Sequence, residues 1–355
     1  MINKKIRVLI VDDSSVIRTL LNKVLSSDPD IEIVGMAPDP YFARDKLIDL
    51  KPDVMTLDIE MPKMDGITFL GKVMQHYPVR TLIFSSLSTK NSAMALKAIE
   101  AGAVDVMAKP AIDVTKGLAE LSEEIVRRVK MVARSNLQTS QRVKPPEIVN
   151  KPKLSPTALQ KTTHQIIAIA SSTGGTEALK EVLPYLPEDL PGTVIVQHMP
   201  PVFTKTYAES LDKICPFEVK EAEHGDRVIP GRVLLAPGNY HMELSRSGAY
   251  YSVKLHQEPL IHGVRPAADY LMKSVAKYAG ANAIGVVLTG MGKDGAEGLL
   301  TMKNAGSYNI AQDEKTCIVY GMPKAAVDLE AIHALMPLNK IAAEIISQIK
   351  VRAVA

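Results

Sequence analysis

The sequence predicts an α/β protein made of two doubly wound domains, each built on a parallel sheet. In both halves of the chain, short apolar runs alternate with segments of helical periodicity. The 355 residues are too many for one ordinary core. A stretch rich in proline and polar residues separates the halves. We expect residues 1–125 to form the first domain, 126–162 a linker and 163–355 the second domain.

The composition is typical of a globular protein from a reducing compartment. Apolar residues make up 46% of the chain, and the net charge of +3 is too small to favour nucleic acid or a membrane surface as a partner. The two cysteines, Cys215 and Cys317, provide neither a disulfide framework nor metal-ligand spacing. No apolar signal region is present, and no apolar run reaches the ~18 residues of a membrane span. We therefore expect a cytoplasmic protein that does not insert into the membrane.

Five apolar runs in the first half have the character of parallel strands. The first is continuous, as in a strand buried on both faces. Helical periodicity between the runs indicates a doubly wound domain, whose ligands lie beyond the carboxyl ends of the strands. The predicted strands are Ile6–Val11, Ile31–Met36, Val54–Leu57, Thr81–Phe84 and Val104–Ala108.

Polar side chains directly follow four of these predicted strands. They are Asp12 and Asp13, Asp58, Ser85 (with Ser86 as the alternative), and Lys109. Three carboxylates at one edge of a sheet repel each other unless a cation joins them, and hard oxygen ligands of this kind suit Mg²⁺. Solvated loop acids are the alternative interpretation, but this combination at successive strand ends disfavours it.

The first half resembles the receiver domain of two-component response regulators over residues 4–125. The resemblance implies a flavodoxin-like fold in which Asp58 accepts a phosphoryl group from a histidine kinase. It also implies that Asp12 and Asp13, with Asp58, hold Mg²⁺. Ser85 would be the switch hydroxyl, and Lys109 would contact the phosphoryl oxygens. An aspartyl phosphate adds charge and acceptor oxygens towards which such a hydroxyl and ammonium can reorient.

The second half is predicted to be a doubly wound domain with a mostly parallel sheet and a β-hairpin. Buried strands are expected at Ile166–Ala170, Thr193–His198 and Ala283–Leu288. The hairpin is expected from Met242–Leu244 and Tyr250–His256, which flank a short polar segment with glycine.

The first of these strands ends in a hydroxyl cluster and two glycines, Ser171–Gly175, and a helical pattern follows. Such a turn lifts one side chain clear of the sheet and points the first free N–H groups of the helix at a ligand. A serine placed there can be a nucleophile with its oxyanion donors at hand. A phosphate- or nucleotide-binding turn and a helix N-cap are the alternatives.

Three apolar strands of the second half are followed by Ser172, His198 and Asp294. Because the carboxyl ends of parallel strands share one edge, these side chains can converge. A neutral imidazole can take the serine proton, and a carboxylate can fix the imidazole tautomer. The order Ser, His, Asp and the absence of G-x-S-x-G disfavour an α/β-hydrolase.

Other residues compete for these roles. His224 and His241 are alternative bases, but His198 is favoured because it alone follows a central strand. Asp226 and Asp269 are weaker candidates for the acid. Asp294 could instead cap a helix, and its glycine-rich turn could bind phosphate.

Four segments behind the receiver-like half resemble the chemotaxis response regulator protein-glutamate methylesterases, the CheB family. They are Ser172–Gly175, Gln197–Pro200, Ala236–Met242 and Leu288–Gly295. The resemblance implies that Ser172 is the nucleophile, His198 the base and Asp294 its orienting acid. It further implies that backbone N–H groups near Thr173 and Met291 form an oxyanion hole.

The same resemblance implies a phosphorylation-activated hydrolase that needs no cofactor for its esterase reaction. Its substrates would be γ-methyl glutamyl esters and certain glutamines on the cytoplasmic helices of methyl-accepting chemotaxis receptors. Two positions depart from the family pattern: Ser171 stands where Ala is usual, and Ala267 where Ser is usual. The first leaves open which serine reacts.

Two other functions are alternatives for the second half. A DNA-binding domain is disfavoured because no compact helix-turn-helix pattern is present, so no nucleic acid partner is expected. A nucleotide-binding module would use the turns at Gly174–Gly175 and Gly290–Gly295.

Overall fold

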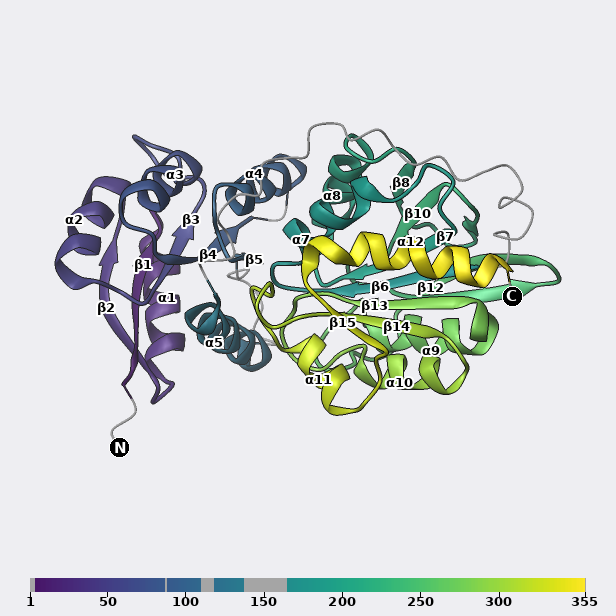
Figure 1. Cartoon of the computed structure of the whole chain (residues 1–355). Coiled ribbons are helices and arrows are strands. Elements are labelled where there is room, and N and C mark those ends of the chain that lie inside the picture. Colours follow the sequence, from purple (N-terminus) through teal and green to yellow (C-terminus); the bar gives the residue numbers. More distant parts are fainter. Residues whose placement is uncertain (1–3, 87, 110–117, 137–164, 355) are drawn as a thin grey trace. The chain divides into compact units, whose positions relative to one another are not determined.

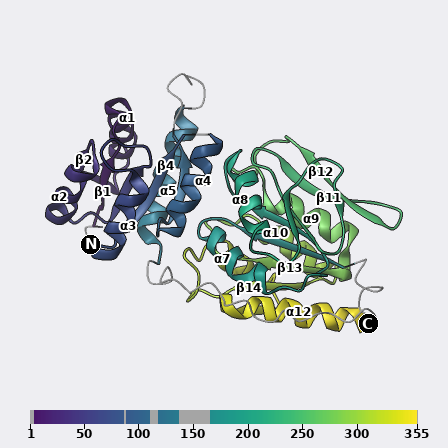
Figure 2. The same ribbon diagram turned by 90° about the horizontal axis from the view of Figure 1, so that it is seen from above.

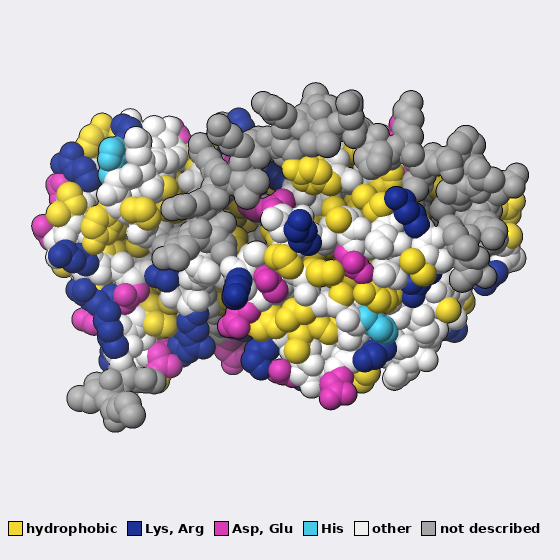
Figure 3. All heavy atoms as spheres, viewed as in Figure 1, with side chains coloured by type: hydrophobic (Ala, Val, Ile, Leu, Met, Phe, Trp, Pro, Cys, Tyr) yellow, Lys and Arg dark blue, Asp and Glu magenta, His cyan; other side chains and the backbone are white. Residues whose placement is uncertain are grey.

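The computed structural model describes residues 4–86, 88–109, 118–136 and 165–354. The chain divides into two compact units, Met1–Ser140 and Gln141–Ala355, which are described separately below. Among the described residues, no helix has both the length and the apolar character needed to cross a bilayer. On the face shown in Figure 3, basic and acidic side chains are interspersed, as the small net charge leads one to expect.

The first unit is a doubly wound domain whose five-stranded parallel sheet has the order β2-β1-β3-β4-β5 (Figure 1). The predicted fold is confirmed, and the helix between β3 and β4 is an element that the sequence analysis did not place. The strands are β1 (Ile6–Val11), β2 (Ile31–Ala37), β3 (Val54–Asp58), β4 (Arg80–Ser85) and β5 (Asp105–Ala108). The helices are α1 (Ser15–Ser26), α2 (Pro40–Leu50), α3 (Gly66–His76), α4 (Thr89–Glu100) and α5 (Leu118–Arg134).

The strand order of this sheet reverses between β1 and β3, which creates a crevice at their carboxyl ends. Position 66, at the start of α3 beside that crevice, requires a glycine. A Cβ atom there would lie 2.1 Å from the carbonyl oxygen of Asp58. Its N–H donates to the carbonyl of Ile59 at 2.8 Å. The absence of a side chain therefore lets α3 begin directly against the end of β3.

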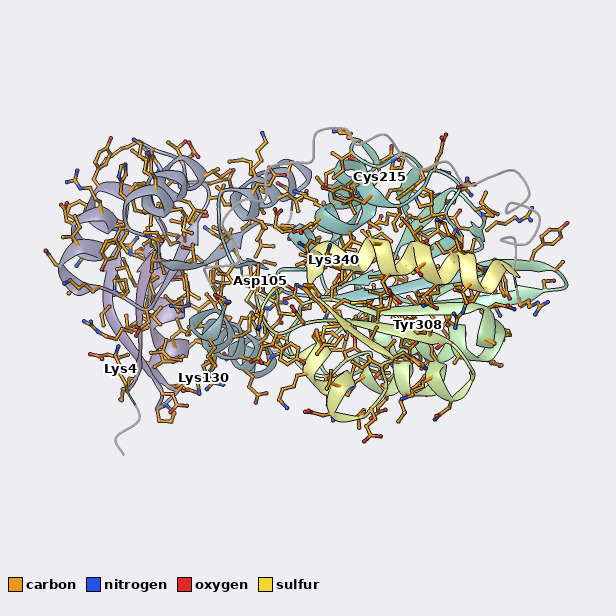
Figure 4. All side chains as sticks on the ribbon, in the orientation of Figure 1. Lys4, Asp105, Lys130, Cys215, Tyr308 and Lys340 are labelled. Atoms are coloured by element: carbon orange, nitrogen blue, oxygen red, sulfur yellow. The ribbon has the colours of Figure 1, made fainter. Side chains whose placement is uncertain are left out.

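Helix α5 is anchored to the first unit by ion pairs near its C-terminal end. Lys130 contacts Asp28 at 2.7 Å and Asp30 at 2.8 Å, and Arg128 contacts Asp105 at 2.7 Å (Figure 4 labels Lys130 and Asp105). The first residues of the segment expected to be a linker, 126–162, are therefore helical. Residues 137–164 lie outside the described residues.

The second unit contains a seven-stranded sheet in the order β15-β14-β13-β6-β7-β10-β8, in which all neighbouring strands are parallel. Figure 1 shows α7 and α12 on one face of it, and α9, α10 and α11 on the other. Figure 2 gives the view from above. The strands are β6 (Ile166–Ser171), β7 (Gly192–Gln197), β8 (Glu218–Glu221), β10 (Arg232–Leu235), β13 (Ala283–Val287), β14 (Tyr308–Gln312) and β15 (Ala334–Met336). The helices are α7 (Gly175–Val182), α8 (Phe203–Asp212), α9 (Ala268–Tyr278), α10 (Ala296–Asn304), α11 (Met322–Asp328) and α12 (Leu338–Val354), with short 3₁₀ turns at Leu183–Tyr185 and Gly280–Asn282.

The predicted hairpin is confirmed, but it belongs to a separate antiparallel sheet. Strands β11 (His241–Ser247) and β12 (Tyr250–His256) pair in antiparallel fashion, and the short β9 (Arg227–Val228) extends the sheet beside β12. The predicted fold of the second unit, a parallel sheet with a β-hairpin, is confirmed, and every neighbouring pair of strands in the main sheet is parallel.

The strand order of the main sheet reverses between β6 and β13, so its crevice lies at the carboxyl ends of these two strands. Every residue of β6 and of β7 is buried, which explains their continuous apolar sequences. Ser172 and His198 directly follow their strands, as predicted. Asp294 does not, because β13 ends at Val287 and a turn over residues 288–295 separates it from α10.

Candidate active site and candidate phosphorylation site

The two adjacent serines at the end of β6 have different environments. Ser171 is fully buried, and its hydroxyl donates to Oε1 of Gln197 at 2.6 Å. Ser172 is 9% exposed, and its hydroxyl makes no hydrogen bond within the described parts of the chain. The geometry therefore favours Ser172 as the hydroxyl that can react, since the Ser171 hydroxyl is already engaged.

Gln197, the last residue of β7, joins the ends of the two central strands. Its Nε2 donates to the carbonyl of Ser172 at 2.8 Å and to that of His198 at 3.3 Å. Gly175 makes room for this amide, because a Cβ there would lie 2.2 Å from Gln197 Oε1. Sequence reasoning did not single out Gln197. The feature of the sequence that could have identified Gln197 is a side-chain amide at the end of an otherwise apolar strand, because a buried amide needs hydrogen-bond partners.

His198 pairs with the buried Asp294, with Nε2 of the imidazole 2.8 Å from Oδ2 of the carboxylate. The same oxygen accepts the N–H of Ala268 at 2.6 Å, and Oδ1 accepts the N–H of Asp269 at 3.0 Å. Both N–H groups belong to the first turn of α9, where the helix dipole favours a negative charge. Asp294 thus takes the place of a side-chain cap that Ala267 cannot supply.

These contacts determine the protonation state of Asp294. Burial alone raises the pKa of a carboxyl group. The hydrogen bond and charge of His198, together with the two N–H groups of α9, outweigh burial and hold the pKa of Asp294 below its ordinary value. Asp294 is therefore ionised at neutral pH and can orient the imidazole.

The turn after β13 packs directly against Ser172. The Ser172 N–H donates to the carbonyl of Thr289 at 3.1 Å, and a Cβ on Gly290 would lie 2.8 Å from Ser172 Cβ. The Thr289 hydroxyl donates to the carbonyl of Thr173 at 3.0 Å. The Met291 N–H has no hydrogen-bond acceptor among the described residues. The structure thus brings the peptide segments of Thr173 and Met291 to the same serine, with Thr289 as a link that the sequence analysis did not identify.

The competing histidines have other roles. His241 is fully buried, its Nε2 lies 3.1 Å from the Pro259 carbonyl, and its Nδ1 accepts the Ala267 N–H at 3.1 Å. Burial, with contributions from neighbouring positive groups, holds the pKa of His241 below its ordinary value. His224 is exposed and contacts the backbone of Leu255. The ring nitrogens of His241 are thus occupied within the fold.

The competing aspartates are also engaged. Asp226 accepts the Glu223 N–H at 2.7 Å and pairs with Lys220 at 3.0 Å. Asp269 lies beside Asp294 and contacts His262 at 3.1 Å. Neither carboxylate contacts His198.

In the first unit, the structure gathers the three predicted carboxylates. One ligand oxygen from each of Asp12, Asp13 and Asp58 lies within 4.8 Å of the others. Asp12 and Asp58 are buried, whereas Asp13 is exposed. Lys109 Nζ lies 3.0 Å from Asp12 Oδ2 and 2.7 Å from Asp58 Oδ2. Three hard oxygen donors with one side open to solvent fit a Mg²⁺ ion that keeps several waters.

The pKa of Asp58 is raised by this environment. Burial is the largest cause and the Asp12 charge adds to it, so the pKa lies at about 6 although Lys109 acts in the opposite direction. For Lys109, burial lowers the pKa but the two carboxylates outweigh burial and raise it. The site therefore holds more negative charge than its one ammonium compensates.

The two candidate switch hydroxyls lie at the end of β4. Ser85 is buried, and its carbonyl accepts the N–H of Lys109 at 2.8 Å. Ser86 is exposed, and its hydroxyl accepts a hydrogen bond from the Asn91 amide, which also donates to Glu60 at 3.0 Å. Ser85 is thus the buried hydroxyl residue next to Lys109.

Two family models match the chain. Residues 167–345 match the model described as CheB methylesterase, and residues 8–120 match the response regulator receiver domain.

Two similar proteins cover nearly the whole chain. A Bdellovibrio bacteriovorus protein named protein-glutamate methylesterase/protein-glutamine glutaminase is 63% identical over 98% of this chain and 99% of its own length. A Syntrophus aciditrophicus protein of the same name, numbered 2, is 52% identical over 97% and 99%, respectively. Among solved structures, the CheB methylesterase catalytic domain of Thermotoga maritima is similar, with 41% identity and a TM-score of 0.51 over 52% of this chain and 97% of that chain.

Proposed function

Since this chain belongs to the CheB methylesterase family and is a protein-glutamate methylesterase and protein-glutamine glutaminase, we propose that Ser172, His198 and Asp294 carry its reaction. The observation that supports this most strongly is the His198–Asp294 pair at 2.8 Å. His198 follows the strand beside the one that precedes Ser172, and the Ser172 hydroxyl has no partner in the described residues. The substrates are γ-methyl glutamyl esters and certain glutamines on the cytoplasmic helices of methyl-accepting chemotaxis receptors.

The reaction begins with attack of Ser172 Oγ on the side-chain carbonyl carbon of the substrate. Because Nε2 of His198 faces Asp294, Nδ1 is the ring nitrogen left to take the serine proton. This orientation is the reverse of that in the chymotrypsin triad, where Nδ1 faces the aspartate. His198 then returns the proton to the departing methanol or ammonia, which leaves an acyl-serine that water hydrolyses to glutamate.

Negative charge develops on the carbonyl oxygen during both steps. Backbone N–H groups of Thr173 and Met291 stabilise it, because such donors cost no reorganisation when they are held in place beforehand. The hydrogen bond from Thr289 to the Thr173 carbonyl and the close approach of Gly290 to Ser172 supply that rigidity.

The first unit regulates this reaction through phosphorylation of Asp58 by a histidine kinase. Asp12, Asp13 and Asp58 are the residues that would hold Mg²⁺, which neutralises negative charge during phosphoryl transfer. Lys109 contacts the phosphoryl oxygens, and Ser85 reorients towards them. The unphosphorylated first unit inhibits the esterase reaction, and phosphorylation of Asp58 relieves that inhibition.

Methanol release from methylated receptor membranes tests the assignment of the nucleophile. Ser172→Ala should lower turnover of the full chain by about 10³-fold or more, since removal of the nucleophile leaves only binding and oxyanion stabilisation. Ser171→Ala is the matched control, and its turnover should stay within about threefold of wild type. Full activity of Ser172→Ala, or loss in Ser171→Ala alone, would assign the reaction to another residue.

A chain that starts near Lys161 tests the regulatory proposal. The homologous catalytic domain crystallised alone, so this part of the chain is expected to fold by itself. It should turn over faster than the unphosphorylated full chain. Equal rates would show that the receiver does not inhibit the site.

A further inference from the structure

A second aspartate lies directly behind the His198–Asp294 pair. Asp269 is fully buried, and its side-chain Oδ1 accepts the N–H of Gly298 at 2.7 Å. Gly298 belongs to the first turn of α10, whereas Asp269 belongs to the first turn of α9. Asp294 precedes α10 and accepts N–H groups of α9. Asp269 on α9 therefore caps α10, and Asp294, which precedes α10, caps α9.

This reciprocal capping places the two carboxylates close together. One ligand atom from each of His262, Asp269 and Asp294 lies within 4.8 Å of the other two. Gly298 makes the approach of the helices possible, because a Cβ there would lie 2.4 Å from Met272 Cβ and 3.2 Å from Asp269 Oδ1. Two buried carboxylates at this separation repel each other unless each has its own partners.

Each of the two carboxylates contacts one histidine. Asp294 contacts His198, and Asp269 Oδ2 contacts Nε2 of His262 at 3.1 Å. The side chain of His198 is 7% exposed, whereas that of His262 is 26% exposed. Burial and the nearby Asp294 charge raise the pKa of Asp269 despite its contacts with Gly298 and His262. An ionised Asp269 carboxylate therefore costs more free energy at this position than it would in water.

We propose that Asp269 is a positioning residue of the esterase site, whose carboxylate holds Asp294 through the paired helix caps and adds its charge behind His198. This inference rests on the proposed function. A second buried charge stabilises the imidazolium that forms when His198 takes the serine proton. His262, when protonated, offsets part of that charge. The other titratable groups near the two aspartates include His241 on β11, Lys273 on α9, Glu297 on α10 and Lys293 in the turn.

The test is the pH profile of methanol release by the full chain, with methylated receptor membranes as substrate. Asp269→Asn keeps an oxygen acceptor for the Gly298 N–H but removes the charge. We expect kcat to fall about 10-fold with KM unchanged. The acid limb of kcat/KM should move to lower pH by about half a unit or more, since the imidazolium has lost a stabilising charge.

Asp226→Asn is the matched control, because it neutralises another carboxylate that accepts a backbone N–H and pairs with a lysine away from His198. Its profile should superimpose on that of wild type. A profile of Asp269→Asn that also superimposes on wild type would overturn the proposal. If wild type itself released no methanol, the proposed function would fail instead, so the two failures are distinguishable.

His262→Ala gives a second result if Asp269→Asn does not fold. His262 lies at the protein surface, so its removal should preserve the fold. It leaves the Asp269 charge without its imidazole counter-charge, and the acid limb should move to higher pH. If the acid limb of the kcat/KM profile of His262→Ala stayed in place or moved to lower pH, the proposed role of Asp269 would be contradicted.

Discussion

Asp58 and Asp294 occupy similar places in the two units but differ in their chemistry. Each is a buried aspartate in the crevice where a parallel sheet reverses its strand order. The pKa of Asp58 is raised to about 6, whereas that of Asp294 lies below its ordinary value. Burial acts in the same direction on both, so the difference comes from their partners.

The partners of Asp294 are fixed donors, two helix N–H groups and one imidazole. Asp58 shares a single ammonium with a second buried carboxylate, and its nearest backbone donor is the Glu60 N–H at 3.2 Å. A carboxylate such as that of Asp294, whose hydrogen-bond donors are all supplied by the fold, is suited to orienting a neighbouring group permanently. A carboxylate such as that of Asp58, with too few donors, is suited to accepting a cation and a phosphoryl group.

Removal of the Asp294 charge should have the largest effect. In Asp294→Asn, an amide replaces the acceptor that selects the His198 tautomer, and α9 loses an ionised cap. We expect kcat for methanol release to fall by about 10³- to 10⁴-fold. Circular dichroism should show that the variant remains folded. A loss smaller than tenfold in a folded variant would mean that Asp294 does not orient the base.

Removal of the Asp58 charge should make the first unit more stable to unfolding. The folded pKa of about 6 exceeds the ordinary value of 3.8, so the folded unit binds more protons than the unfolded chain between these pH values. Stability therefore falls as pH rises through that window. At pH 7, Asp58→Asn should be more stable than wild type by up to about 3 kcal/mol, and at pH 4 the difference should nearly vanish.

Pulse proteolysis in urea, with peptides from residues 54–80 as the readout, measures this difference. Saturating Mg²⁺ serves as the control, because the cation compensates the charge of wild type and should narrow the gap. A wild-type receiver that is more stable than Asp58→Asn at pH 7 without Mg²⁺ would contradict the raised pKa.

Gln197 should show a smaller effect, on both stability and turnover. Gln197→Ala leaves the Ser171 hydroxyl and the Ser172 carbonyl without their buried partner, which should cost about 1–3 kcal/mol of the free energy of unfolding. Turnover should fall about 10-fold as the ends of β6 and β7 lose their link. Gln348→Ala, which removes a half-buried amide on α12, is the control and should change stability by about 0.5 kcal/mol or less. If the two variants changed stability and turnover equally, Gln197 would have no specific role at the site.

Much of this arrangement could be predicted from the sequence because buried parallel strands are continuous apolar runs and polar residues at their ends lie on one edge. Ser172 and His198 are of this kind. An amide at the end of an apolar strand marks Gln197 as a residue that needs buried partners. The groups that Gln197 and Thr289 link could not be predicted, because they depend on which strands are neighbours. The helix caps of Asp269 and Asp294 depend on how two helices pack, and spacing along the chain does not encode that packing.

Covalent labelling with a serine-directed fluorophosphonate, followed by fragment-ion mass spectrometry of the full chain, tests the central assignment most directly. We predict one adduct, on Ser172, which His198→Gln greatly slows because the proton of the hydroxyl then has no acceptor. An adduct on Ser171, or labelling of Ser172 at the same rate in His198→Gln, would contradict the account.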